Sequence, residues 1–336
     1  PGHHGHRRHV RGPYMSEQGK YPVIFISLKD LKADTWEKTF ERLKELISDL
    51  YAEFEGFKKC FDKLSAEQRR IAFDGSMEEL SQTQNTQVIL LAFGMGIYSV
   101  LKENGIKPDF AAGLSLGEYT ALCSAGVFEY EDALKLVQFR ANEMVKASKD
   151  VDSSMAAVLG LEQEPLAECC KEASNGDKKA EITNVNCPGQ IVISGEASAV
   201  AKASELAMGK GARRVMPLSV SGPFHTSYMK PVGDALLEKT KEFNSGEGEF
   251  PVLFNYTGDV KQADESVSEL LSMQVQSGVL MEKIIRKLIE LGVTNFVEIG
   301  PGNALSGFIK KIDRSVKTIS ITTADELRQA IEELGR

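Results

Sequence analysis

The regular alternation of short apolar segments with longer amphipathic ones constrains the fold most strongly. Segments with the length of buried strands lie at residues 22–27, 109–112, 252–255 and 295–299. Helix-patterned stretches alternate with them, at 35–57, 87–102, from 116 onward, 132–149 and 279–291. Strands that alternate with helices predict a mainly parallel sheet, so we expect an α/β fold.

The middle of the chain has a different order of segments. A strand at 155–161 precedes a helix at 165–173, two short strands around Ile182 and 191–194, a helix at 197–208 and a strand at 214–216. This β-α-β-β-α-β order is that of a ferredoxin-like unit, which predicts a small inserted domain. We therefore predict a tag or disordered tail, a large α/β catalytic domain in two pieces and a small ferredoxin-like domain, at 1–14, 15–150 with 218–336, and 151–217.

Composition excludes several classes of protein. The 336 residues are 42% hydrophobic and 26% charged, as in an ordinary globular protein. No apolar run approaches the roughly 18 residues that a membrane helix needs. The net charge of −8 argues against nucleic acid as the main partner, because phosphates require a basic surface. We expect no nucleic-acid binding and no membrane segment.

Cysteine and histidine usage narrows the chemistry. The five cysteines lack paired CxxC spacing, so we predict no disulfide framework, no metal site and a reducing cytoplasmic location. The segment PGHHGHRRHVRGPY lacks an apolar signal region and precedes Met15, so we interpret it as a tag, linker or disordered tail. With that segment set aside, His225 is the one histidine left. We expect no cofactor.

The stretch GLSLGEYTAL, residues 113–122, contains the pattern G-x-S-x-G at Gly113, Ser115 and Gly117. In α/β folds this pattern marks a nucleophile elbow, a tight turn between a strand and a helix. The serine hydroxyl then lies at the helix N-terminus, where the backbone N–H of Leu116 can stabilise an oxyanion. The alternative is a glycine-flanked helix cap. The position after a strand and before a helix favours the nucleophile.

A serine nucleophile needs a general base, and histidine is the usual one because its pKa lies near neutrality. His225 lies in the segment SGPFH, where glycine and proline indicate a loop. A lone histidine is more often a structural residue. Its uniqueness outside the first fourteen residues and its loop setting favour the role of base here.

Six motifs together resemble the malonyl-CoA:acyl-carrier-protein transacylases in order and spacing, from about Met77 to the C-terminus. They are GLSLGEYTAL, Arg140 in VQFRAN, NVNCPGQ at 184–190, GARRV at 211–215, SGPFH at 221–225 and EIGPG at 298–302. The resemblance implies a two-step transfer that supplies fatty acid synthesis. Ser115, activated by His225, would take the malonyl group from malonyl-CoA and pass it to the pantetheine thiol of acyl carrier protein.

The resemblance also implies roles for residues around the nucleophile. Arg140 would bind the malonyl carboxylate, since a planar guanidinium matches a carboxylate with two hydrogen bonds. Phe224 would limit the room for an α-methyl branch. A backbone carbonyl would orient the histidine, and the matching position is Leu280. Residues that would line the CoA and pantetheine side of the cleft are Asn184, Asn186, Gln190 and Arg214.

The expected protein partner is acyl carrier protein, which is acidic. An acidic enzyme would need a local basic patch to receive it, and Lys210, Arg213 and Arg214 are the candidates. We expect the enzyme to be a monomer.

The chain departs from the family pattern at two places. Leu114 stands where the family usually has histidine before the nucleophile, and residues 23–30 replace the family's Gly-Gln-Gly-Ser-Gln loop. That loop supplies a second oxyanion N–H in the family. A backbone amide of Leu28 or Lys29 is the candidate replacement.

Three alternatives remain at this stage. A related acyltransferase could take another carboxylated acyl group, such as methylmalonyl. A serine hydrolase could use the same G-x-S-x-G, although an acid between nucleophile and histidine is expected there. A weakened relative could serve only to bind the carrier protein.

Overall fold

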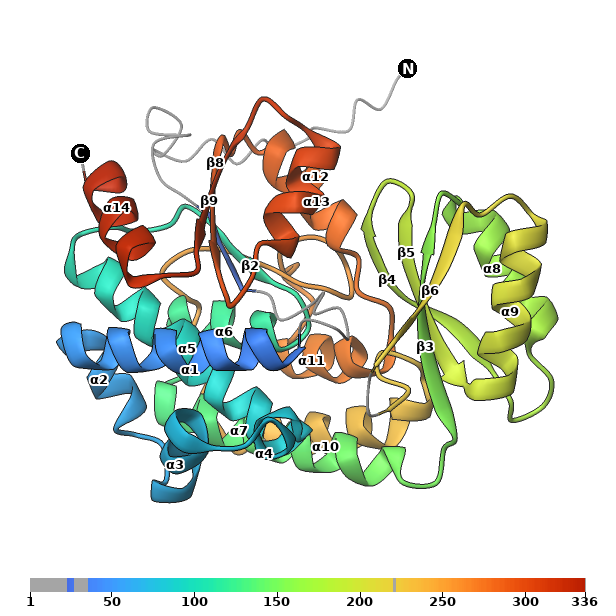
Figure 1. Ribbon diagram of the computed structural model, residues 1–336, viewed down its shortest axis with the longest axis horizontal. Coiled ribbons are helices and arrows are strands. Elements are labelled where there is room, and N and C mark those ends of the chain that lie inside the picture. The colour runs from blue at the N-terminus through green and yellow to red at the C-terminus, as the bar shows by residue number, and fades with distance from the viewer. Residues whose placement is uncertain (1–22, 27–35, 220–221, 336) are drawn as a thin grey trace, which may run out of the picture.

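The computed structural model describes residues 23–26, 36–219 and 222–335, which form two β-sheets and the helices around them (Figure 1). The first sheet has the strand order β7-β2-β1-β8-β9, and its neighbouring strands pair in parallel. Its strands are β1 (Val23–Ile26), β2 (Ala111–Gly113), β7 (Val252–Leu253), β8 (Asn295–Ile299) and β9 (Lys317–Ile321). The expectation of an α/β fold with a mainly parallel sheet agrees with this arrangement.

Helices cover both faces of the parallel sheet, because successive strand residues point to opposite sides. Ala111 belongs to a large core with α5 and α6, whereas Ala112 belongs to a second core with α12 and α13. The helices of the first core are α1 (Trp36–Glu53), α2 (Glu55–Phe61), α3 (Ala66–Asp74), α4 (Met77–Ser81), α5 (Thr83–Glu103), α6 (Leu116–Ser124), α7 (Tyr130–Ser148), α10 (Lys230–Thr240), α11 (Val267–Gln276) and α14 (Ala324–Leu334). Those of the second core are α12 (Met281–Glu290) and α13 (Ala304–Ile312).

The second sheet is antiparallel and lies beside the first, at the right of Figure 1. Its strand order is β4-β5-β3-β6, with α8 and α9 packed on one face. The opposite face carries Met155, Ala157 and Val192. Its elements are β3 (Ser153–Leu159), α8 (Gln163–Ala173), β4 (Ala180–Cys187), β5 (Gln190–Glu196), α9 (Ala197–Gly209) and β6 (Arg214–Leu218). A short 3-10 helix, Ser227–Met229, then leads into α10.

Several element boundaries differ from the sequence expectation. The helix expected at 87–102 begins earlier, at Thr83. Its cap is Gln82, whose backbone is extended, and not Thr86, so the helix gains about one turn at its start. Its end is as expected, with Gly105 at a φ of 77°. Helix α11 was not predicted, although Ser266 and Glu269 form a capping box at its start.

Two further observations concern the cysteines and the helices. All five cysteines are free thiols in the structure. Within residues 23–26, 36–219 and 222–335, no helix is both long and apolar enough to span a membrane. The predicted tail at 1–14 lies outside the described residues.

Candidate active site

Ser115 sits in a strained turn between β2 and α6. Its φ of 56° and ψ of −107° lie outside the regions that a residue with a side chain ordinarily adopts. Among the described residues, positive φ at a non-glycine position occurs only at Ser115 and at His225, with φ 61°. Strain of this kind persists only where surrounding contacts hold it, and it concentrates at functional sites.

The glycine at position 113 has a steric reason. A Cβ atom on Gly113 would collide with the backbone of Gly117, so the start of the turn and the first turn of α6 pack backbone to backbone. Leu116 is the first residue of α6, and its amide is therefore among those without an acceptor inside the helix. Leu116 also lines the cavity in front of Ser115.

His225 contacts the serine directly. The distance between Ser115 Oγ and His225 Nε2 is 2.7 Å, and His225 Nδ1 lies 2.9 Å from the backbone oxygen of Gln274. A carbonyl can only accept, so Nδ1 carries the proton and Nε2 is the nitrogen that accepts the hydroxyl proton of Ser115. This is the geometry of a nucleophile and its general base.

The carbonyl that orients the histidine belongs to Gln274, so the assignment to Leu280 was wrong. Gln274 lies in the last turn of α11, where backbone carbonyls lack partners inside the helix. Two of these carbonyls bind His225, since Val275 O accepts its backbone N–H at 3.2 Å. Leu280 instead immediately precedes α12 and donates its N–H to Asn255 O.

Arg140 brings a buried guanidinium to the nucleophile. The residue is only 1% exposed, and its Nη2 donates to Ser115 Oγ at 3.0 Å. Two amide oxygens hold it, Gln87 Oε1 at 2.6 Å and Gln274 Oε1 at 3.3 Å, and the Tyr119 ring lies 5.1 Å from its Cζ. Burial lowers the pKa of Arg140, while Tyr119 and Glu118 act in the opposite direction. A guanidinium held by neutral groups is well suited to receive an anion.

A cavity of about 220 Å³ opens in front of Ser115. Six of the predicted residues line it, namely Ser115, His225, Arg140, Leu116, Asn184 and Phe224. Three others do not belong to its lining. Asn186 is buried in β4, Gln190 accepts a hydrogen bond from Lys311 Nζ at 3.1 Å, and Arg214 is exposed at the start of β6.

Sequence reasoning missed four polar residues that support this site. Gln87 holds Arg140, and Gln274 holds both Arg140 and the backbone oxygen of Ser115, to which its Nε2 donates at 2.7 Å. Glu118 and Asn255 are fully buried beside the turn. The available signal was a polar side chain next to an apolar run, as for Gln87 in the sequence NTQVILLAF.

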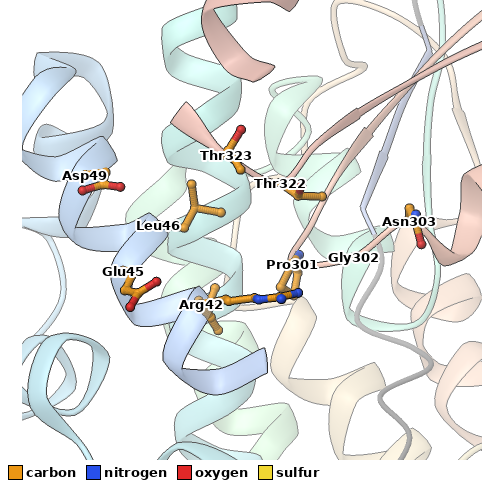
Figure 2. A pocket seen from close by; sticks show the side chains of 10 residues that line it. Arg42, Glu45, Leu46, Asp49, Pro301, Gly302, Asn303, Thr322 and Thr323 are labelled. Carbon is orange, nitrogen blue, oxygen red and sulfur yellow. The ribbon is translucent and has the colours of Figure 1, made fainter. Parts of the chain in front are cut away.

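A second cavity, of about 420 Å³, lies between α1 and the loop that follows β8 (Figure 2). The side chain of Arg42 reaches toward Pro301 there, and Glu45 and Asp49 project from the same helix. All three are exposed, in contrast to Arg140. The described residues that line this cavity therefore offer mixed, solvated charge and no paired nucleophile and base.

Two further expectations concern the surroundings of the site. In the part of the chain that the structure describes, no group of three His, Cys, Asp or Glu side chains could hold a metal ion. Strand β1 ends at Ile26, which pairs with Gly113 beside the nucleophile. Leu28 and Lys29, the candidates for a second oxyanion amide, lie outside the described residues.

The family comparison identifies the class of protein. Residues 27–326 match the family model of the acyl transferase domain. This match includes Ser115, Arg140 and His225, so the residues that converge on the cavity all lie within the matched acyl transferase domain.

Individual relatives narrow this class further. The chain is 40% identical over 290 residues to the malonyl CoA-acyl carrier protein transacylase of Bacillus subtilis (strain 168), which covers 85% of this chain and 92% of that protein. Malonyl-transacylase from Streptococcus pneumoniae superimposes with a TM-score of 0.83 at 34% identity, over 93% of this chain and 99% of that one. The chain belongs to the malonyl CoA-acyl carrier protein transacylase family.

One solved relative includes a protein partner. It is a malonyl-transacylase in complex with the holo form of its type II polyketide synthase acyl carrier protein. The TM-score is 0.84 at 32% identity, over 93% of this chain and 99% of that one.

Proposed function

We propose that this protein transfers a malonyl group from malonyl-CoA to the pantetheine thiol of acyl carrier protein, through an ester on Ser115, and so supplies fatty acid synthesis. The observation that carries the proposal is the convergence of three groups. Ser115 Oγ lies 2.7 Å from the base, His225 Nε2, and 3.0 Å from the buried cation, Arg140 Nη2. Membership of the transacylase family supports the same reaction.

In the first step, His225 Nε2 takes the hydroxyl proton as Ser115 Oγ attacks the thioester carbon of malonyl-CoA. The carbonyl electrons move to oxygen, and the N–H of Leu116 stabilises the resulting anion at the start of α6. The C–S bond then breaks, and the proton held by His225 passes to the CoA sulfur. The products are malonyl-Ser115 and free CoA.

In the second step, the pantetheine thiol of acyl carrier protein attacks the ester. His225 takes the thiol proton, the carbonyl carbon forms a new C–S bond, and the bond to Ser115 Oγ breaks. The proton returns to Oγ, which restores the enzyme. The bond from His225 Nδ1 to Gln274 O keeps the ring in the required tautomer through both steps.

The acyl group is selected by charge and by size in this proposal. The Arg140 guanidinium pairs with the malonyl carboxylate, which replaces the contact with Ser115 Oγ. Phe224 lines the cavity of about 220 Å³ and limits room beside the α-carbon. A related enzyme that accepts another carboxylated acyl group, such as methylmalonyl, would leave more room beside the α-carbon. Competition between malonyl-CoA and methylmalonyl-CoA distinguishes the two, and equal rates would contradict the selection by size.

We also propose that the Ser115 turn is a nucleophile elbow and that residues 151–217 are an inserted ferredoxin-like domain. The β-α-β-β-α-β order from β3 to β6 and the antiparallel strand order β4-β5-β3-β6 support the insertion. Met155 and Asn184 of this sheet line the cavity with residues of the first sheet's helices. The small domain therefore forms one wall of the site, and Asn186, Gln190 and Arg214 remain candidates for the CoA and pantetheine path.

We further propose that a monomer works in the cytoplasm and receives acyl carrier protein on a basic patch. Arg213 and Arg214 are exposed at the start of β6, and Lys210 is paired with Glu168 at 2.6 Å. If the patch steers an acidic partner, KM for acyl carrier protein rises with salt. Reversing Arg213 and Arg214 to glutamate should remove most of that dependence, and an unchanged salt dependence would contradict the patch.

The direct test of the transfer is an assay with malonyl-CoA and holo acyl carrier protein, in which free CoA and malonyl carrier protein are both measured. Equal amounts of the two products support the transferase. CoA release without malonyl carrier protein would indicate a serine hydrolase. Binding of carrier protein without CoA release would indicate a module that only binds it.

A further inference from the structure

Asn255 spans the turn that carries the nucleophile. Its Oδ1 accepts the backbone N–H of Ser115 at 2.7 Å, and its Nδ2 donates to the backbone oxygen of Gly113 at 2.6 Å. These two backbone groups stand on either side of Leu114, and Asn255 is 140 residues away from Ser115 in the sequence. A single carboxamide therefore satisfies a donor and an acceptor of the strained turn.

The backbone of Asn255 is fixed as well. Its N–H donates to Glu118 Oε2 at 2.5 Å, and its carbonyl accepts the N–H of Leu280 at 2.9 Å. Asn255 and Glu118 are both 0% exposed, so water does not compete for these bonds. Glu118 lies in α6, the helix that begins after Ser115. This helix therefore fixes Asn255, and Asn255 in turn fixes the backbone at Ser115.

The state of Glu118 suits this function. Burial raises its pKa to about 8, although the Asn255 N–H and the charge on Arg140 act in the opposite direction. The neutral carboxyl is then the main form at neutral pH, and it still presents an oxygen to Asn255. Glutamine is a close match for that form in shape and in acceptor.

We propose that Asn255 is a positioning residue that keeps Ser115 in its reactive geometry, and that Glu118 fixes Asn255 in place. The inference rests on the proposed function only in taking Ser115 as the nucleophile. Because Asn255 occupies the N–H of Ser115, that amide is not available to an oxyanion. The N–H of Leu116 is the donor that the turn leaves open.

Two reagents separate this inference from the choice of substrate. A fluorophosphonate reacts with an activated serine and needs no recognition of malonyl-CoA, so its rate of attachment to Ser115 reports the geometry of the nucleophile alone. Malonyl-CoA reports the same step with the proposed substrate. Wild type that reacts with the fluorophosphonate but not with malonyl-CoA would refute the proposed function and leave the positioning test valid. Wild type that reacts with neither would overturn both.

The first variant is Asn255→Ala, which removes both side-chain bonds to the turn. We expect Ser115 to react with either reagent about 10- to 100-fold more slowly, as the loss of buried hydrogen bonds implies, while KM for malonyl-CoA changes by less than about threefold. Asn104→Ala is the control, because Asn104 Nδ2 bonds a single backbone oxygen, Val100 O, at the far end of α5. A lower melting temperature with unchanged labelling would show a purely structural role and overturn the proposal.

Glu118 supplies a second test that does not depend on the folding of Asn255→Ala. Glu118→Gln keeps the acceptor for Asn255, so labelling should stay within about threefold of wild type, whereas Glu118→Ala should slow it about 10-fold. Equal rates for the two variants, both measured on the folded fraction, would contradict the role of Glu118. Asn255→Asp keeps only the acceptor for Ser115, and we expect a rate between those of wild type and Asn255→Ala.

Discussion

Two strand–helix junctions of the parallel sheet are built from the same parts but differ in whether a carboxyl group binds the first amides of the helix. At each, a strand leads through a glycine-containing turn into a helix, and a buried glutamate lies beside it: Glu118 at the β2–α6 junction and Glu298 at the β8–α13 junction. Glu298 accepts the N–H groups of Leu305 and Ser306 at 3.0 and 2.8 Å. The start of α13 is therefore filled by the protein's own carboxyl group, and we call the β8–α13 junction the closed junction.

At the β2–α6 junction, which we call the open junction, the glutamate binds a distant residue and not the start of the helix. Glu118 accepts the backbone N–H of Asn255, and the Ser115 side chain makes no capping bond and faces His225. Under the proposed mechanism, the amide of Leu116 at the start of α6 then stabilises the anion that forms during the reaction. For this reason the cavity at the start of α6 is suited to chemistry, whereas the larger cavity beside Pro301 in Figure 2 is not.

The largest expected effect comes from removing the nucleophile at the open junction. Ser115→Ala should lower malonyl transfer to acyl carrier protein by at least about 10⁴-fold, since the hydroxyl that contacts the base His225 is lost. The measurement is steady-state transfer from labelled malonyl-CoA. Ser306→Ala at the closed junction removes the hydroxyl that bonds Ser320 Oγ and the Glu298 carboxyl group, and it should leave turnover unchanged. Substantial transfer by Ser115→Ala would contradict the role of Ser115 as the nucleophile.

The next effect concerns the buried cation. Arg140→Ala should lower kcat/KM for malonyl-CoA by about 10²–10³-fold, because a desolvated charge pair with the substrate is lost. The rate with acetyl-CoA, which has no carboxylate, should fall much less. Arg42→Ala alters the exposed arginine of the second cavity and serves as the control, with no expected change. Equal losses for malonyl-CoA and acetyl-CoA would argue against a carboxylate contact.

The closed junction should respond in stability rather than in rate. Glu298→Ala leaves the amides of Leu305 and Ser306 without their acceptor, and we expect the free energy of unfolding to fall by about 1–3 kcal/mol. Denaturant unfolding measures this loss. The acylation rate per folded molecule should stay within about twofold of wild type, and a large fall in that rate would mean that the two junctions are not separate in function.

The last effect is a dependence of stability on pH, which is spread over several pH units. Burial raises the pKa of Glu118 to about 8 from an ordinary value of 4.5, so the folded protein binds more protons than the unfolded chain between these pH values. The free energy of unfolding should therefore fall as pH rises through this range, by at most about 1.4 kcal/mol per pH unit from this group. Glu118→Gln should flatten the profile, and an identical profile would contradict the buried, protonated state.

Local patterns predicted the open junction well. The alternation of strands and helices gave the parallel sheet, and G-x-S-x-G with a single candidate histidine pointed to Ser115 and His225, which lie 2.7 Å apart. These inferences succeed because a strand, a tight turn and a helix start depend on neighbouring residues. Arg140 followed only from the family resemblance, since an arginine in an amphipathic helix is ordinarily exposed.

Contacts between distant segments could not be predicted in the same way. The wrong assignment of Leu280 arose because α11 was not recognised, and only the end of that helix provides the free carbonyl of Gln274. The bond between Asn255 and Glu118 joins residues 137 positions apart, and no local period encodes it. The motif positions of Gln190 and Arg214 also did not predict their place in the fold, because neither residue lines the cavity.

The most direct test of the central claim is the intact mass of the enzyme after brief mixing with malonyl-CoA and acid quenching, followed by peptide mapping. We predict a mass increase of one malonyl group, located on the peptide that contains Ser115 and lost again when holo acyl carrier protein is added before the quench. No adduct at saturating malonyl-CoA, or an adduct on another residue, would contradict it.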